Sequence, residues 1–290
     1  MRQNLRLLPF LLFVFSLSRA GCVFAADARI ELIVLAEPPF EQVVASDSEA
    51  ASRKFPTLQQ LSAKKNGVID EAKWVAENGI KAVFLQVPNP FTGSLGELPE
   101  TVPAKDGNLL CVRAFRDDVY GYVVYGENFS AGTLLTLWTP DFQELKAKFD
   151  FSNFRTAPKV IPGDEGFVDQ STGYATVVEE VLYVSHSHRT YAKSSGGKNA
   201  FITAIDLKTG KLLWRSAPLV SNASNFVISG DAILSGYGFT NEEDFLFVLN
   251  RHTGKTVTKI PVKSGPERIA LIGTRLYVRT YNTDYQFQVK

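Results

Sequence analysis

The sequence has few of the residues on which redox, metal and nucleophilic chemistry depends. Its 290 residues include two cysteines, three histidines and one methionine. Cys111 lies in the apolar run 109–112, which indicates a buried core thiol, and it has no disulfide partner if Cys22 leaves with an export signal. No serine has the Gly-x-Ser-x-Gly context of an esterase nucleophile. The chain therefore shows no catalytic motif, and we expect no cofactor.

An excess of charge of one sign is also absent. The formal net charge is +1, and it becomes −2 when residues 1–25, which contain three arginines and no acid, are removed. A nearly neutral chain has no electrostatic attraction to nucleic acid or to an anionic membrane surface. We expect no nucleic-acid partner, and membrane contact only if Cys22 carries a lipid.

Residues 1–25 have the pattern of a signal peptide. A basic start is followed by an apolar stretch over residues 7–17 and by side chains that allow cleavage before Ala26. The apolar stretch is shorter than the ~20 residues needed to span a membrane, although an uncleaved anchor is an alternative. A second alternative is lipidation at Cys22, which follows the small residues Ala20 and Gly21. We expect an exported protein, periplasmic or extracellular, or one that is lipid-anchored through Cys22.

Turn residues and β-formers dominate the rest of the chain. Twenty-one glycines, 14 prolines and 12% aromatic residues are typical of a β-rich protein with many turns. The clearest unit is residues 201–216, where an apolar strand leads into an Asp206-x-x-Thr209-Gly210 turn and a second strand carrying Trp214. The Asx side chain can accept hydrogen bonds from turn N–H groups, and Gly210 can take a positive φ.

This Asx-x-x-Thr-Gly turn recurs after other apolar runs. It stands at residues 89–93 and 250–254, with a degenerate form at 140–143. Gly210 and Gly254 are 44 residues apart, which falls within the ~40–50 residue range of a four-stranded propeller blade. Residues 245–249 are apolar at every position, which indicates a strand covered on both faces. The sequence predicts an all-β fold, a β-propeller of about five four-stranded blades.

The N-terminal part of the chain decides how such a ring would close. The last copy, at residues 268–289, lacks an outer strand, and we predict that a strand at residues 29–36 completes this blade. Residues 37–71 are expected to form an irregular connection, in which a sixth blade is an alternative, and residues 151–173 an insertion. The dipeptide Asn78-Gly79 favours a hairpin over a helix at this point. Residues 26–290 are thus expected to form a single domain.

The repeat also points to a family. Ala204-Ile205-Asp206, the Thr209-Gly210 pair and Trp214 resemble the repeat of the pyrroloquinoline-quinone-like (PQQ-like) β-propellers, and the resemblance covers roughly residues 72–290. The next copy has Thr258 in place of the tryptophan. The quinone-dependent alcohol dehydrogenases of this family are much longer and carry a pair of adjacent cysteines, which this chain lacks. The resemblance therefore implies the non-enzymatic periplasmic branch, which presents loops and strand edges to partners.

His186 and His188 are the candidate metal ligands. If the strand from Val181 continues, both imidazoles point to the same side, where they could hold zinc or copper together with a third ligand. In the alternative, both lie at the base of the polar loop 186–198 and face solvent. Trp214 is expected to pack between blades rather than to stack on a ligand. No catalytic residue is predicted.

The sequence favours a binding protein over an enzyme. We expect a binding or scaffold module for a protein partner or small ligand in the cell envelope. The alternative is a small-molecule enzyme or metal-binding propeller that uses the central channel. Functional side chains are expected where the chain departs from the repeat, at residues 151–173 and 186–198.

Overall fold

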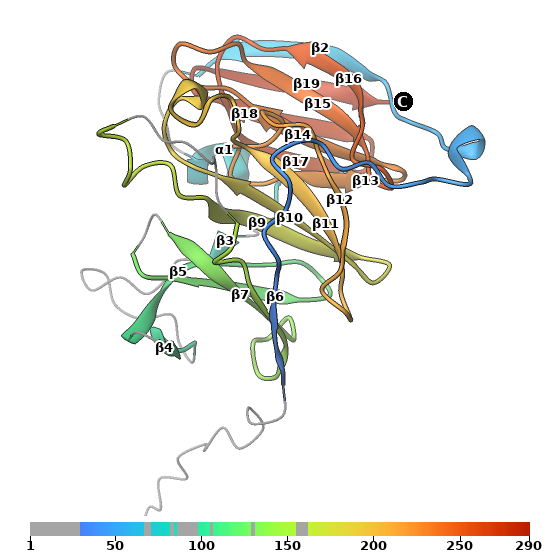
Figure 1. Ribbon diagram of the computed structural model, residues 1–290. Coiled ribbons are helices and arrows are strands. Elements are labelled where there is room, and N and C mark those ends of the chain that lie inside the picture. Colours follow the sequence, from blue (N-terminus) through green and yellow to red (C-terminus); the bar gives the residue numbers. More distant parts are fainter. Residues whose placement is uncertain are drawn as a thin grey trace, which may run out of the picture.

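The computed structural model describes residues 30–66, 71–81, 84–85, 98–104, 107–128, 131–154 and 162–290. Four β-sheets make up most of the secondary structure of these residues, with one short α-helix, α1 (Glu71–Glu77), beside them (Figure 1). Two single turns of 3₁₀ helix lie at Ala50–Ser52 and Ala192–Ser195. Within these described ranges no helix combines the length and the apolar character that crossing a membrane requires.

The first sheet contains seven strands in the order β1-β8-β7-β6-β5-β3, with β4 also paired to β5. Its four central strands follow one another along the chain and are antiparallel: β5 (Gly107–Arg116), β6 (Gly121–Gly126), β7 (Gly132–Trp138) and β8 (Leu145–Asp150). The additional strands are short: β1 (Leu32–Val34), β3 (Phe84–Leu85) and β4 (Thr101–Ala104).

The other three sheets each contain four antiparallel strands. The second sheet consists of β9 (Ser171–Val178), β10 (Val181–Ser187), β11 (Phe201–Asp206) and β12 (Leu212–Arg215). The third consists of β13 (Val227–Ser229), β14 (Ala232–Tyr237), β15 (Phe245–Asn250) and β16 (Thr256–Pro261). The fourth consists of β17 (Pro266–Ile272), β18 (Arg275–Thr280), β19 (Thr283–Val289) and β2 (Leu58–Lys65).

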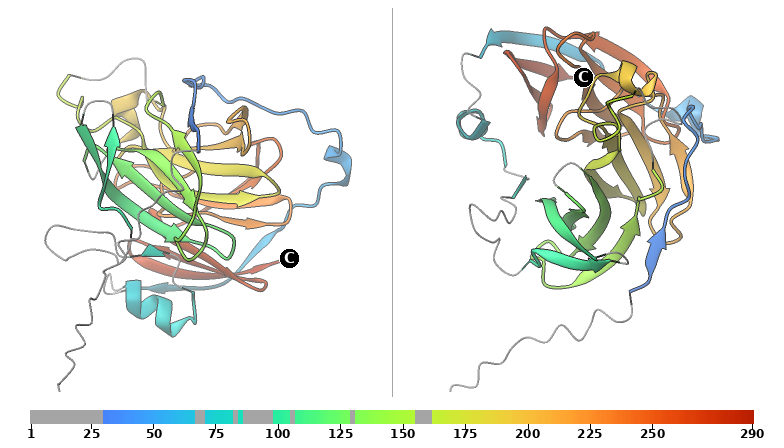
Figure 2. Two further views of the ribbon diagram at one scale, coloured as in Figure 1. Left: turned by 90° about the horizontal axis from the view of Figure 1, so that it is seen from below. Right: turned by 60° about the vertical axis from the view of Figure 1, so that its left-hand side comes forward.

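The four sheets follow one another around an arc, as propeller blades do (Figure 2). The strand-turn-strand unit predicted at residues 201–216 forms β11 and β12, and the apolar run 245–249 lies in β15. The predicted copy around residues 80–98, with its turn at 89–93, lies largely outside the described residues. The count of five blades therefore stays a prediction.

The prediction for the strand that completes the last blade was right about its origin and wrong about its residues. The outer strand of the fourth sheet comes from the N-terminal part of the chain, but it is β2, which pairs antiparallel with β19. The expected segment forms β1, which pairs parallel with β8 of the first sheet. β2 was not predicted because this outermost strand is exposed along most of its length and its sequence has almost no hydrophobic pattern.

The hairpin predicted at Asn78-Gly79 is wrong, because these residues end α1. Gly79 has a φ of +63°, the Ile80 N–H bonds the Val75 carbonyl at 2.9 Å, and the Gly79 N–H bonds the Ala76 carbonyl at 3.2 Å. This is the Schellman arrangement of a helix C-terminus. The same dipeptide marks a hairpin and a helix end because both require a positive φ, so the dipeptide alone does not distinguish them.

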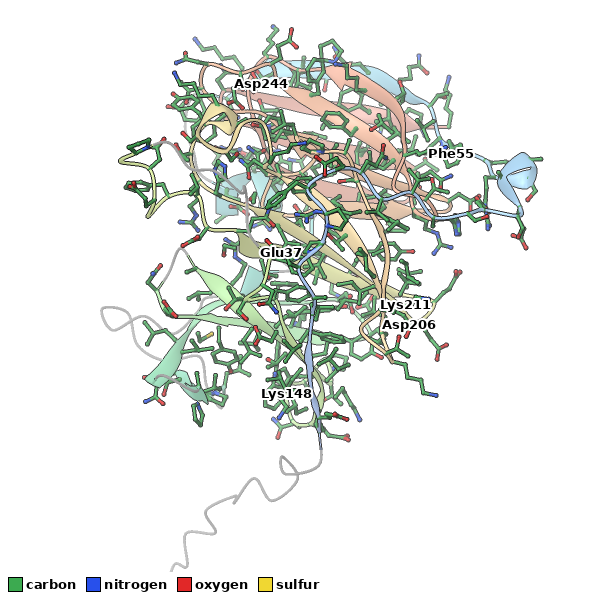
Figure 3. The ribbon with its side chains drawn as sticks, in the orientation of Figure 1. Glu37, Phe55, Lys148, Asp206, Lys211 and Asp244 are labelled. Atoms are coloured by element: carbon green, nitrogen blue, oxygen red, sulfur yellow. The ribbon has the colours of Figure 1, made fainter. Side chains whose placement is uncertain are left out.

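The two best-preserved turns have the predicted geometry. Asp206 Oδ1 accepts from the Thr209 N–H at 2.7 Å and from the Thr209 hydroxyl at 2.6 Å. The Asp206 N–H bonds the carbonyl of Lys211 at 2.9 Å, and Figure 3 labels both of these residues. Gly210 and Gly254 have φ values of +69° and +73°. These positive values explain the glycine at the end of each turn.

The core lies between the sheets rather than inside any one of them. Successive residues of β15 contribute to different clusters: Phe247 and Leu249 face the second sheet, and Leu246 and Val248 face the fourth. This alternation confirms that a continuously apolar strand is covered on both faces. A third cluster covers the far face of the first sheet and includes Leu98 and Cys111.

The N-terminal segment, residues 30–57, crosses the outer side of all four sheets in order, and we call it the belt (Figure 1). After β1, Val43 exchanges two backbone hydrogen bonds of 2.9 Å with Arg215 of the second sheet. Arg53 then forms an ion pair of 3.4 Å with Asp231 of the third sheet, and Thr57 pairs with the C-terminal Lys290. The N-terminal part of the expected irregular connection is therefore attached to the sheets along its length.

Candidate functional site: the central pocket

A pocket of about 630 Å³ lies where the inner strands of the sheets converge. Each sheet contributes one strand to the pocket wall. These strands are the C-terminal end of β5 from the first sheet, β9 from the second, the start of β13 from the third and β17 from the fourth. The segment containing α1 forms the remaining side. The position is the centre of the arc, and the volume suits a side chain or a small molecule.

Most of the pocket wall is apolar. β17 contributes four consecutive apolar residues, Ile269–Ile272, and the opposite side carries the aliphatic side chains of Ala72, Val75 and Ile80. Ile272 is 42% exposed, so part of this apolar surface is accessible to solvent. An accessible apolar wall favours an occupant that buries its own apolar groups there.

Two ion pairs connect the α1 segment to the sheets on either side of it. Glu71 pairs with Arg268 of the fourth sheet, and Lys81 pairs with Asp118 in the turn between β5 and β6 of the first sheet. Burial lowers the pKa of Arg268 to about 10, and the hydrogen bond and charge of Lys81 lower the pKa of Asp118. The α1 segment thus spans the open side of the arc.

Asp117 is on the pocket wall but is occupied with local structure. Its Oδ1 accepts from the N–H groups of Val119 and Tyr120, both at 2.8 Å. Its Oδ2 accepts from the Tyr122 hydroxyl at 2.7 Å and from the Thr176 hydroxyl at 3.1 Å. These bonds tie the turn after β5 to the second sheet, so Asp117 is a structural residue rather than a candidate base.

Arg116 precedes Asp117 in the chain and, unlike Asp117, has a side chain that is free to bind a ligand. Its side chain is exposed on the pocket wall and has no hydrogen-bond or ion-pair partner among the residues that the structure describes. An arginine guanidinium presents five donors in a planar fork that suits carboxylates and phosphates. Among the residues that the structure describes, the pocket therefore combines an apolar wall with one available cation, Arg116.

The histidines predicted as metal ligands lie away from this pocket. His186 is 1% exposed, and its ring centroid is 4.8 Å from that of Phe151 and 4.7 Å from that of Phe154. Burial, and then the charge of Arg215, lowers the pKa of His186 well below its usual value. The Nε2 atom has no hydrogen-bond partner in the described structure.

His188 lies in a polar setting but is also buried. Its Nε2 is 2.8 Å from the Ser195 hydroxyl, its Nδ1 accepts from the Thr190 N–H at 3.2 Å, and burial lowers its pKa to about 4. The expectation that both histidines face solvent is therefore wrong. Across the described ranges, no three or more His, Cys, Asp and Glu side chains gather closely enough to hold a metal ion, and the metal site stays a prediction.

Other residues behave as the sequence indicated. Cys111 is 1% exposed, and burial raises the pKa of its thiol to about 11. Trp214 is 1% exposed and packs on the turn of the third sheet, where its Nε1 donates to the Arg251 carbonyl at 2.9 Å. Trp214 is thus an inter-sheet packing contact, as expected.

Sequence reasoning missed the pocket almost entirely. Functional side chains were expected in the insertion 151–173 and in the loop 186–198, but none of the residues that the structure describes in either segment lines the pocket. Its residues come instead from α1, the end of β5 and β17, and their side-chain types are ordinary. The only sequence feature that could have indicated Arg116 is its position as a charged residue directly after the buried residues Ala114 and Phe115. Nothing in the sequence showed that its side chain lies on the pocket wall.

Comparisons with known proteins give no family. No family model matches the chain, and no curated protein matches it. Among solved structures it is similar to BamB from Moraxella catarrhalis, with 14% identity, 60% of this chain and 68% of that chain covered, and a TM-score of 0.29.

Two further structures have the same kind of likeness. For GH43B of the Bacteroides ovatus xyloglucan PUL the identity is 16%, the TM-score is 0.39, and 61% of this chain and 38% of that chain are covered. For the AfRom2 CNH domain the identity is 10%, the TM-score is 0.32, and 63% of this chain and 61% of that chain are covered. At such values the blade-like interpretation depends on the strand order and packing described above.

Proposed function

We propose that this protein is an exported, PQQ-like β-propeller module that binds a protein partner in the cell envelope through its central pocket. The observation that carries the proposal is the accessible apolar wall formed by residues 270–272 at the point where four sheets converge. Burial of apolar surface is the main driving force of protein association, and a concave wall lets a partner bury more of it.

The membership of the PQQ-like type is supported by the turns. Asp206 and Asn250 cap their turns through side-chain oxygens, and Trp214 packs on the glycine of the following turn. These contacts give a physical role to each residue of the repeat. Binding of a quinone is not part of the proposal, because the chain lacks the adjacent cysteines of the quinone enzymes.

Export is proposed from residues 1–25, which lie outside the described residues. It is tested by expressing the full chain in a Gram-negative host and determining the N-terminus of the protein released from the envelope. Cleavage by signal peptidase gives Ala26 as the first residue, and lipidation gives a modified Cys22. Retention of Met1 in a cytoplasmic fraction would contradict export.

The binding proposal is tested with two matched substitutions. Ile272 is 42% exposed on the pocket wall, and Val257 is 43% exposed on the outer strand β16. We expect the wild-type protein and the Val257→Asp variant to cross-link the same partner from envelope extract, and the Ile272→Asp variant to lose it. Equal capture by all three proteins would show that the pocket is not the binding site.

A further inference from the structure

The inner edge of β17 faces the central pocket with its main chain. Five consecutive residues, Arg268–Ile272, line the pocket, although successive side chains of a strand point to opposite faces. A run of consecutive residues can share one wall only if the backbone edge itself forms that wall. The accessible surface of β17 is therefore a strand edge, which offers N–H and C=O groups as well as side chains.

The pairing of β17 with β18 shows which groups point outward. The strands are joined by the two-residue turn Gly273-Thr274, and Ile272 pairs with Arg275 beside it. Because hydrogen-bonded and non-hydrogen-bonded pairs alternate in an antiparallel ladder, the N–H and C=O groups of Ile269 and Leu271 point away from β18, toward the pocket.

The side chain of Asn225 confirms this direction, because it already bonds the outward-pointing main-chain groups of Ile269. Its Nδ2 donates to the Ile269 carbonyl at 2.7 Å, and its Oδ1 accepts from the Ile269 N–H at 3.0 Å. One side-chain amide thus reproduces the two bonds of a neighbouring strand residue. Two residues further along, Leu271 has the same orientation and no such partner among the described residues.

The charges around this edge indicate what a strand laid along it would carry. Glu71 and Arg268 are paired, Lys81 and Asp118 are paired, and the carboxylate of Asp117 is filled by four donors. Arg116 is the charged group of the wall that has no partner in the described part of the chain. The complementary ligand group is a carboxylate.

We propose that the central pocket binds an extended segment of a protein partner, which pairs with Leu271 of β17 and places an acidic side chain, flanked by apolar ones, at Arg116. This inference rests on the proposed function and deepens it by naming the chemistry of the partner. Main-chain pairing at a sheet edge supplies affinity, and the pockets for alternate side chains supply selectivity. The side chains on either side of the acid pack on Val75 and Ile272.

The test uses a defined probe rather than the unknown partner. The probe is the blocked peptide acetyl-Ser-Val-Glu-Val-Ser-amide, compared with its Gln analogue and with a form N-methylated at the second valine. We expect the Glu peptide to bind about threefold to fivefold tighter than the Gln peptide, as for a partly exposed ion pair. The N-methylated form, which lacks a main-chain donor, is expected to lose binding without any change in the protein.

Two variants assign these effects to residues. In Arg116→Gln the preference for Glu over Gln is expected to disappear, whereas Arg189→Gln, which removes another exposed arginine away from the pocket, keeps it. The Leu271 amide, followed by NMR hydrogen exchange, is expected to become protected when the Glu peptide is bound.

The outcomes separate the two proposals. Equal binding of the Glu and Gln peptides by the wild-type protein, or an unprotected Leu271 amide at saturation, overturns the extended acidic segment. If the Ile272→Asp variant still fails to capture the partner in that case, the central pocket remains a binding site for a different chemistry. If the substitution at Ile272 has no effect either, both proposals fail.

Discussion

The indole of Trp214 lies directly over the Cα of Gly254. A Cβ atom built on Gly254 would be 2.4 Å from Cε3 of the indole, and the indole Nε1 donates to the Arg251 carbonyl of the same turn. The outer strand of the second sheet is thereby attached to the turn of the third. Gly210, the equivalent turn residue of the second sheet, is covered instead by Ile33 of the belt, whose Cγ2 would be 2.2 Å from an added Cβ.

Replacement of Gly254 by alanine tests this contact. The positive φ costs about 1–2 kcal/mol for a residue with a Cβ, and the overlap with the buried indole adds about 1–3 kcal/mol. Gly273→Ala is the control, because Gly273 has a φ of +56° and nothing within 4 Å of its added Cβ. Urea unfolding should show a larger loss of stability for Gly254→Ala, and equal losses would mean that the indole moves aside freely.

The buried histidines predict a loss of stability in acid. The pKa of His186 is well below its usual value and that of His188 is about 4, so the folded state disfavours their protonation. Stability is therefore full above the unfolded pKa of about 6.5 and falls as the pH drops toward the folded values, by up to about 1.4 kcal/mol per pH unit for each group.

The variant His186→Phe should weaken this acid dependence, because a phenyl ring can replace the imidazole between Phe151 and Phe154. The free energy of unfolding is measured in urea between pH 7 and pH 5 for both proteins. The same slope in the variant would show that His186 does not contribute to it.

The thiol of Cys111 should be almost unreactive in the folded protein. It is 1% exposed, and its pKa of about 11 leaves little thiolate at neutral pH. In a Cys22→Ser background we expect the reaction with an aromatic disulfide reagent to be roughly a hundredfold slower in buffer than in urea. Similar rates in both solvents would place the thiol at the surface.

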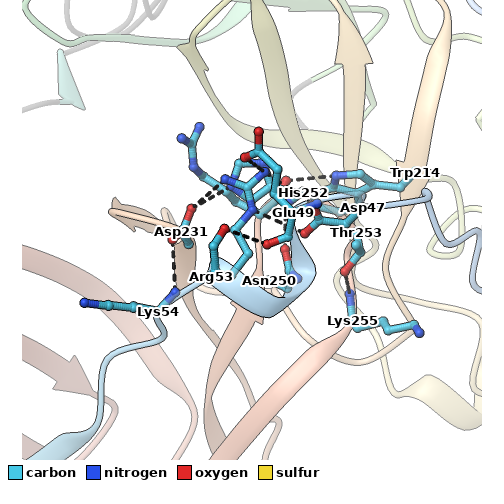
Figure 4. Close-up of polar contacts among 12 residues, drawn as sticks. Asp47, Glu49, Arg53, Lys54, Trp214, Asp231, Asn250, His252, Thr253 and Lys255 are labelled. Carbon is cyan, nitrogen blue, oxygen red and sulfur yellow. Dashed lines mark hydrogen bonds and ion pairs between the residues drawn. The ribbon is translucent and has the colours of Figure 1, made fainter.

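The belt should depend on the charge of Arg53. This side chain forms ion pairs with Asp47, Glu49 and Asp231, and Asp231 also accepts from His252 Nε2 at 2.8 Å (Figure 4). In Arg53→Gln we expect faster proteolysis within residues 44–53, and a smaller difference from the wild type in high salt, because salt screens these pairs. Arg189→Gln is the control, since Arg189 is exposed and lies outside the belt.

The strands and turns of the repeats could be predicted from the sequence because their causes are local. An Asx side chain, a threonine and a glycine specify the turns at Asp206 and Asn250, and the apolar run of β15 specifies a strand covered on both faces. The burial of Cys111 and Trp214 followed from the same hydrophobic pattern.

The closing strand, α1 and the pocket depended on contacts between distant segments. β2 is a strand because β19 offers its free edge, although its own sequence is mostly polar and exposed. Asn78-Gly79 could end either a helix or a strand, and packing of Trp74 against the fourth sheet accompanies the helix.

By itself, the sequence determined the repeating strand-turn-strand unit and its two-sided burial, because backbone conformation at glycine and hydrophobic periodicity act over a few residues. Only the tertiary structure decided which N-terminal strand completes the last sheet and where the accessible site lies. Those features depend on which edges and charges remain unpaired after the sheets have packed. Arg116 and Leu271 are 155 residues apart in the chain, and no local pattern brings them to the same wall.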